Sequence, residues 1–196
     1  MPQSIARIGT EGALTLSLDE AINPYVKLGA AYWRSVCGRR RFPARADLTL
    51  RGMAAILPFA VILSVVDRGA DFEYRYVGEA QRQAFKTSFK GLRVSQIEAA
   101  VPQLGSLLRN AYEHARALGT PFIIRGRVDH EPADSKLLYH ESAFLPLGVS
   151  DAEVDHLLIV GVQIPEPFWD IPMDKLTTLA DQSGAGVPSA ASATAR

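Results

Sequence analysis

The chain has 196 residues, of which 47% are hydrophobic and 21% are charged, so it carries enough apolar material for one compact core and for terminal tails. Lys plus Arg and Asp plus Glu both number 21, and the resulting net charge of zero excludes a global positive field that would hold nucleic acid or an anionic membrane. The single cysteine, Cys37, excludes an internal disulfide, and residues 1–7 lack the apolar core of a secretory signal. We therefore expect a cytoplasmic protein without nucleic-acid or membrane partners.

A helix is expected over residues 24–37. Asn23 has the form of an N-cap, Pro24 suits the first helical position, and Gly38 supplies the stop. The apolar residues of this segment recur at helical spacing and form one face: Tyr25, Val26, Gly29, Trp33, Val36 and Cys37. Residues 1–23 ahead of the helix show no strong pattern and are expected to be partly loose.

Residues 53–66 form the longest apolar run. A bilayer-spanning helix needs about 20 apolar residues. This run is shorter and Pro58 interrupts it, so we do not expect it to enter a membrane. Its second half is rich in β-branched side chains, which favours a buried strand beginning near Pro58. After a turn, residues 72–77 alternate aromatic and charged side chains as a half-buried strand does, and this period of two places Tyr74 and Tyr76 on the same face.

The middle of the chain is expected to be helical. Residues 79–85 are typical of a short helix that Gly91 separates from the next segment, and Ser95 to Glu98 has the form of a capping box. From 101 to 118, apolar residues recur at intervals of three and four positions, which predicts an amphipathic helix ended by Gly119.

The last part of the core is expected to form strands. Apolar or alternating runs cover residues 122–128, 137–147 and 154–164, with polar segments between them, as in an antiparallel meander. Together with the two earlier strands they predict an α+β domain over residues 24–165, with helices on one face of a five-stranded antiparallel sheet and a flanking N-terminal helix. Residues 166–196 are rich in small and polar residues and are expected to be a largely disordered tail.

Several short motifs, in this order and spacing, resemble a family of small PAS-type sensory domains common in alphaproteobacteria. They are Trp33, the basic segment ending in Pro43-Ala44-Arg45-Ala46-Asp47, Leu57-Pro58, Tyr74-Arg75-Tyr76-Val77-Gly78, Gly91-Leu92, Glu141 with Leu145-Pro146-Leu147, and Val154 to Leu158. The resemblance covers about residues 24–164 and implies a PAS-like order of helices and strands. Where the family has a small polar residue after the glycine of the second strand, this chain has Glu79, so a ligand contact at that corner is not carried over.

The resemblance implies a sensory or protein-interaction module in bacterial signalling. We expect no output domain in this chain, so that a signal leaves through a signalling protein partner or through a homodimer. PAS-like domains use a flanking N-terminal helix either to cover the outer sheet face or to pair with a second copy. The apolar face of the helix over 24–37 therefore supplies four candidate interface residues, which are Tyr25, Val26, Trp33 and Val36.

The resemblance also allows a small-molecule ligand. The candidate ligand-binding residues are the aromatic Tyr74, Tyr76, Phe85 and Tyr112, together with Arg41 and Arg45. Two arginines four residues apart also occur in cyclic-dinucleotide receptors, where guanidinium groups clamp phosphate, but the accompanying Asp/Asn-x-Ser-x-x-Gly segment is missing here. The alternatives are structural: the arginines pair with Asp47 or bind carbonyl groups, and the tyrosines belong to the core with their hydroxyls satisfied.

No cofactor, metal or catalytic residue is expected. The four histidines have no paired metal spacing, and His140 and Glu141 are neighbours in a strand, so they point to opposite faces. The charged neighbours of His114 disfavour an axial haem ligand, and the position of Cys37 before the first strand disfavours a flavin-reactive cysteine. Nucleophile elbows, glycine-rich phosphate loops and paired carboxylates are missing. A small-molecule-binding enzyme of cone-like α+β fold stays an alternative, because fold does not decide function.

Overall fold

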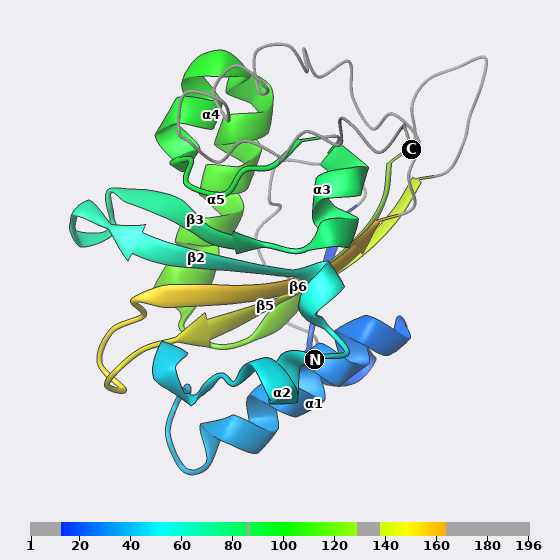
Figure 1. Cartoon of the computed structure of the whole chain (residues 1–196), viewed down its shortest axis with the longest axis vertical. Helices are drawn as coiled ribbons and strands as arrows, with labels where there is room; N and C mark the ends of the chain where they lie inside the picture. The colour runs from blue at the N-terminus through cyan, green and yellow to red at the C-terminus, as the bar shows by residue number, and fades with distance from the viewer. Residues whose placement is uncertain (1–12, 86, 129–137, 164–196) are drawn as a thin grey trace, which may run out of the picture.

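A computed structural model of the chain describes residues 13–85, 87–128 and 138–163. Its core is one antiparallel sheet of six strands in the order β1-β4-β5-β6-β2-β3. Figure 1 labels β2, β3, β5 and β6 of this sheet. The strands are β1 (Ala13–Leu16), β2 (Ala60–Val66), β3 (Asp71–Val77), β4 (Phe122–Val128), β5 (Leu138–Leu147) and β6 (His156–Gln163). The architecture is α+β, and the tail predicted over 166–196 lies outside the described residues.

Helices lie on both faces of the sheet (Figure 1). On the face that we call outer, α1 (Pro24–Cys37) contacts β5 and β6 and is followed by the short α2 (Leu50–Met53). The inner face carries α3 (Glu79–Phe85), α4 (Val94–Ala100) and α5 (Pro102–Leu118), and α5 contacts β3, β5 and β6. Short 3-10 turns connect these elements at η1 (Leu18–Glu20), η2 (Arg45–Asp47), η3 (Leu57–Phe59) and η4 (Asp67–Gly69).

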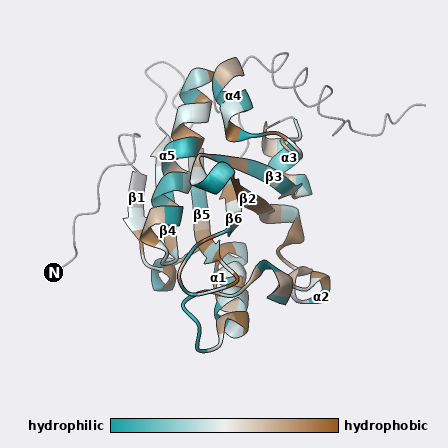
Figure 2. Cartoon of the chain, turned by 90° about the vertical axis from the view of Figure 1, so that its left-hand side faces the viewer, coloured by the Kyte–Doolittle hydropathy of each residue, from teal (hydrophilic) through white to brown (hydrophobic). Residues whose placement is uncertain are grey.

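The sheet has six strands, and the prediction of five is corrected. The additional strand β1 comes from the segment 1–23 and pairs with β4 at the sheet edge, beside it in Figure 2. It spans only 4 residues, too few for an alternating pattern to stand out in the sequence. The other five strands lie close to their predicted ranges.

The predicted capping residues are confirmed at α1, whereas the capping box predicted at the start of α4 is corrected. At α1 the side chain of Asn23 accepts a hydrogen bond from the N–H of Tyr25 at 2.9 Å, and Gly38 follows with a φ of 62°. The capping box predicted at Ser95 does not form, because the Ser95 hydroxyl donates to the buried Asp71 carboxylate at 2.6 Å. α4 instead begins at Val94, one residue earlier than the predicted cap.

The apolar face of α1 is packed against the outer face of the chain's own sheet. Val26 is fully buried, Trp33 is 5% exposed, and a Cβ atom at Gly29 would lie only 2.7 Å from Cγ2 of Val160 on β6. The prediction that Val26 and Trp33 contact a second copy is therefore corrected, because their apolar area is already covered. Of the predicted interface residues, Tyr25 keeps 40% of its surface exposed, and Val36 is half-buried.

Three residues of the short motifs, Trp33, Pro43 and Pro146, make contacts on this outer face. Nε1 of Trp33 donates to the carbonyl oxygen of Pro146 at 2.8 Å. The carbonyl of Pro43 accepts from the N–H of Gly148 at 2.9 Å, and the neighbouring Phe42 is 1% exposed. These contacts fasten α1 and the loop after it to the end of β5, so the motif has a structural role here.

Candidate functional site

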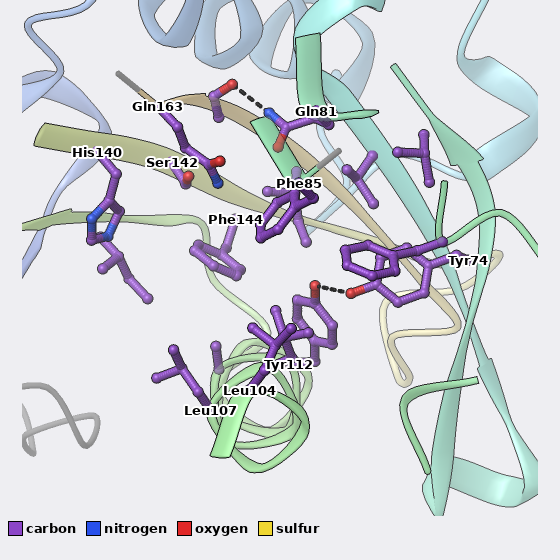
Figure 3. Close-up of a pocket in the computed structure, with 18 residues that line it drawn as sticks. Tyr74, Gln81, Phe85, Leu104, Leu107, Tyr112, His140, Ser142, Phe144 and Gln163 are labelled. Carbon is purple, nitrogen blue, oxygen red and sulfur yellow. Dashed lines mark hydrogen bonds between the residues drawn. The ribbon is translucent and has the colours of Figure 1, made fainter. Parts of the chain in front are cut away.

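A cavity of about 160 Å³ lies between the inner face of the sheet and the helices α3 and α5. Side chains from β2 to β6 form one wall, and side chains of α3 and α5 form the other (Figure 3). Most of the lining residues are apolar, and no Asp, Glu, Lys or Arg belongs to the described residues that line it. The cavity therefore suits an uncharged molecule.

Two buried tyrosines meet in this cavity. Tyr74 on β3 and Tyr112 on α5 are 2% and 5% exposed, and their hydroxyl oxygens lie 2.7 Å apart in a hydrogen bond (Figure 3). Burial raises the pKa of both phenols above the ordinary value of 10.0, so both are protonated and neutral at physiological pH. The Tyr112 ring also contacts Phe72 and Phe144, and these contacts hold its orientation.

Polar side chains gather in another part of the cavity, away from the tyrosine pair (Figure 3). Gln81 on α3 is 6% exposed, and its Nε2 donates to the carbonyl oxygens of Gly161 at 2.6 Å and Phe59 at 3.2 Å. Ser142 on β5 and Gln163 on β6 also line this part. The cavity is amphipathic, since a few polar groups are set into an apolar wall.

His140 is the lining residue whose ordinary pKa is closest to neutral pH. It is half-buried on β5, and burial lowers its pKa below the ordinary value of 6.5. Since the unfolded chain takes up this proton at a higher pH than the folded chain does, the contribution to stability is complete above pH 6.5. It is lost as the pH falls through the lower pKa of the folded state.

We expect the His140→Gln variant to lose less stability than the natural chain when the pH falls from about 7 to about 5. Glutamine has no titrating group, so the contribution of residue 140 becomes independent of pH. Urea unfolding at several pH values measures the difference. An equal loss in the natural chain and in His140→Gln would contradict the prediction.

Three of the six predicted ligand-binding residues line the cavity, namely Tyr74, Phe85 and Tyr112. Tyr76 does not, although the period of two placed it beside Tyr74. In the pairing of β2 with β3, Ile62 faces Tyr76 and Leu63 faces Tyr74, so the register shifts around Arg75. This bulge turns Tyr76 to the opposite face, where its hydroxyl donates to the carbonyl of Leu57 at 3.0 Å. The prediction that Tyr76 lies on the same sheet face as Tyr74 is corrected.

Arg41 and Arg45 are exposed, and neither lines the cavity. Nη2 of Arg41 donates to the carbonyl oxygen of Leu118 at the end of α5, at 3.0 Å. Asp47 pairs with Arg40 and accepts from a backbone N–H, so the predicted pairing of Asp47 with Arg41 or Arg45 is corrected. Arg41 binds a carbonyl group, which is the other structural role predicted for these arginines.

The polar residues of the cavity were not among the residues predicted from the sequence. His140, Ser142 and Phe144 alternate along β5 and all line the cavity, so the period of two could have placed them on one face. Gln163 follows the same rule on β6. Gln81 had no such signal, because nothing in a short polar helix indicates which side chain points inward.

Within the described ranges, no group of three or more His, Cys, Asp and Glu side chains is arranged to hold a metal ion. The helices found in those ranges are too short or too polar to cross a bilayer. Comparisons with known proteins found no match: no protein-family model, no curated protein and no solved structure matches the chain.

Proposed function

We propose that this chain is a PAS-like sensory module of bacterial signalling that binds a small molecule between its sheet and its inner helices. The observation that carries the proposal is the cavity. Well-packed cores leave few voids larger than a water molecule. This one measures about 160 Å³ and combines apolar walls with a few polar groups. Concave sites of that character are where proteins bind small molecules.

The order of the elements supports the PAS-like part of the proposal. From α1 onward the chain runs through a helix, two strands, a set of helices and three strands, which is the order that the family resemblance implies. The motif residues fasten α1 to the outer face, for example through the contact of Trp33 with Pro146. Ligand recognition is then a task of the inner face, where the cavity lies.

A cavity-filling variant tests small-molecule binding. Ala111 on α5 lines the cavity and is 7% exposed, so Ala111→Leu places a larger side chain in the binding space. Ala117→Leu is the matched control, since Ala117 lies on the same helix and is exposed. We expect native mass spectrometry of protein from its source cells to show a bound small molecule on the natural chain and on the control, and none on Ala111→Leu.

Xenon provides a second measurement for the same proposal, because apolar cavities of about 150 Å³ take up xenon or benzene. We expect xenon to shift the NMR resonances of lining residues such as Phe144 and Ile159 in the natural chain. A natural chain that carries no bound small molecule and whose cavity resonances do not respond to xenon would contradict small-molecule binding.

A homodimer is the proposed route by which the signal leaves. Because Val26 and Trp33 are buried, the interface is proposed at the residues of α1 and its N-terminal flank that stay exposed, which are Ile22, Tyr25 and Leu28. Their exposed fractions are 57%, 40% and 48%. Light-scattering mass should correspond to two chains and should fall to one chain when Leu28 is replaced by Glu. A single chain at every concentration of the natural protein would contradict the dimer.

The two other functions considered have less support. An enzyme that uses general acid and base catalysis needs a pair of suitable groups, and neither Asp nor Glu is among the described residues that line the cavity. A cyclic-dinucleotide receptor needs free guanidinium groups at one concave site, whereas Arg41 already binds the end of α5.

A further inference from the structure

The tyrosine pair has one hydrogen-bond donor more than its own contact uses. Each phenol has one O–H, and the pair forms one hydrogen bond, between the hydroxyls of Tyr74 and Tyr112. Within the described part of the chain neither hydroxyl has a second partner. Whichever tyrosine donates, the hydrogen of the other is left without an acceptor. Both side chains are more than nine-tenths buried and line the cavity, so this donor is available to an occupant of the cavity.

Gln81 presents the complementary group. Its Nε2 lies within hydrogen-bond distance of two carbonyl oxygens, which fixes which end of the amide is nitrogen. The amide oxygen therefore points the other way, toward the side of Phe85 in Figure 3. No hydrogen bond from the described residues reaches this oxygen. Gln81 is 6% exposed and lines the cavity, so its oxygen is an acceptor presented to an occupant of the cavity. A ligand donor placed there would form a hydrogen bond with it.

Size and charge restrict the occupant further. A cavity of about 150 Å³ holds benzene, so about 160 Å³ accommodates one ring with small substituents. A carboxylate or an ammonium group would be buried there without an ion partner, because the described lining residues carry no side chain of Asp, Glu, Lys or Arg, and burial lowers the pKa of the lining His140 and so disfavours its charged form. The occupant is therefore neutral.

We propose that the cavity takes a neutral single-ring molecule that accepts a hydrogen bond from the Tyr74–Tyr112 pair and donates one to Oε1 of Gln81. This inference rests on the proposed small-molecule binding and names its chemical class. Recognition is directional, because donor and acceptor lie in different parts of the cavity. A ligand of the right size with only one polar group satisfies only one of them.

The test uses a matched set of para-substituted benzenes with the full chain, and isothermal titration calorimetry measures each affinity. para-Hydroxyacetophenone has both an acceptor carbonyl and a donor hydroxyl. para-Methylacetophenone keeps the carbonyl, para-ethylphenol keeps the hydroxyl, and para-ethyltoluene has neither. para-Hydroxybenzoate replaces the ketone by an anion. We expect the hydroxy ketone to bind most tightly, with a loss of about five- to tenfold for each missing polar group. We expect the anion to bind at least about a hundredfold more weakly.

A pair of variants locates the contact. In the double variant Tyr74→Phe/Tyr112→Phe, the hydroxy ketone should lose its advantage over para-ethylphenol. Tyr76→Phe is the control, since it removes a tyrosine hydroxyl on the opposite sheet face and should keep that advantage. If the double variant does not fold, the ligand series on the natural chain decides alone.

The outcomes separate this inference from the proposed function. Equal binding of para-ethyltoluene or of para-hydroxybenzoate with the hydroxy ketone would overturn the ligand class. So would an advantage of the ketone that survives in the folded double variant. A cavity that takes up xenon but none of the five compounds overturns the class and leaves small-molecule binding intact. A cavity that takes up neither overturns both.

Discussion

Replacing Glu141 with alanine is expected to lower the free energy of unfolding by about 3–5 kcal/mol, because it removes one partner of a buried ion pair. Glu141 on β5 is fully buried. Its Oε1 accepts from the backbone N–H groups of Ile22 and Asn23, each at 3.0 Å, and its Oε2 accepts from Nε of Arg125 at 2.7 Å. The carboxylate thus joins the sheet to the chain segment that caps α1.

Two variants make the Glu141 prediction specific. Glu141→Gln keeps an acceptor oxygen for the backbone N–H groups and is expected to lose less stability than Glu141→Ala. Glu79→Ala removes a carboxylate from an exposed ion pair with Arg82 and is expected to change stability by less than about 1 kcal/mol. Urea unfolding followed by circular dichroism measures all three. A loss for Glu141→Ala no larger than that for Glu79→Ala would contradict the structural role of the buried carboxylate.

Replacing Trp33 with alanine is expected to cost roughly 3–5 kcal/mol of stability, the usual range for removing a large buried aromatic side chain. Trp33 is 5% exposed between α1 and the outer face of the sheet. Its indole N–H is bonded to the carbonyl of Pro146 at 2.8 Å, so the substitution also leaves that buried carbonyl without its partner.

The Trp33 prediction is checked against two less drastic changes. Trp33→Phe keeps most of the apolar volume and loses the hydrogen bond, so it is expected to cost about 1–3 kcal/mol. Tyr25→Ala truncates an aromatic residue of the same helix that is 40% exposed and stacked on Phe59, and it is expected to cost less than Trp33→Ala. Denaturant unfolding followed by far-ultraviolet circular dichroism is suitable, since it does not depend on tryptophan fluorescence. A cost for Trp33→Ala below that for Tyr25→Ala would contradict the packing described for α1.

The candidate site was predicted in part. Tyr74, Phe85 and Tyr112 were named from the sequence and line the cavity. Gln81, whose acceptor oxygen is central to the proposed recognition, was not. The reason is that a cavity is bounded by side chains from elements far apart in the chain, and their relative positions follow from how sheet and helices pack.

Local signals in the sequence determined several elements by themselves. Asn23, Pro24 and Gly38 set the ends of α1 because capping and backbone conformation depend on neighbours only a few residues away. Gly119, with a φ of 59°, ends α5 for the same reason. The alternating and β-branched runs likewise identified the strands from β2 to β6, since side-chain direction in a strand has a fixed period of two.

Only the tertiary structure decided which side chains share a face and which charges are buried. The bulge at Arg75 turns Tyr76 away from Tyr74, and it arises from the pairing of β3 with β2. The strand β1 exists because it pairs with β4, and Glu141 is buried because it meets backbone N–H groups more than a hundred residues away. Each of these features depends on contacts between distant segments. The free energy of such contacts comes from desolvation and packing in the folded state. The order of neighbouring residues in the sequence does not indicate it.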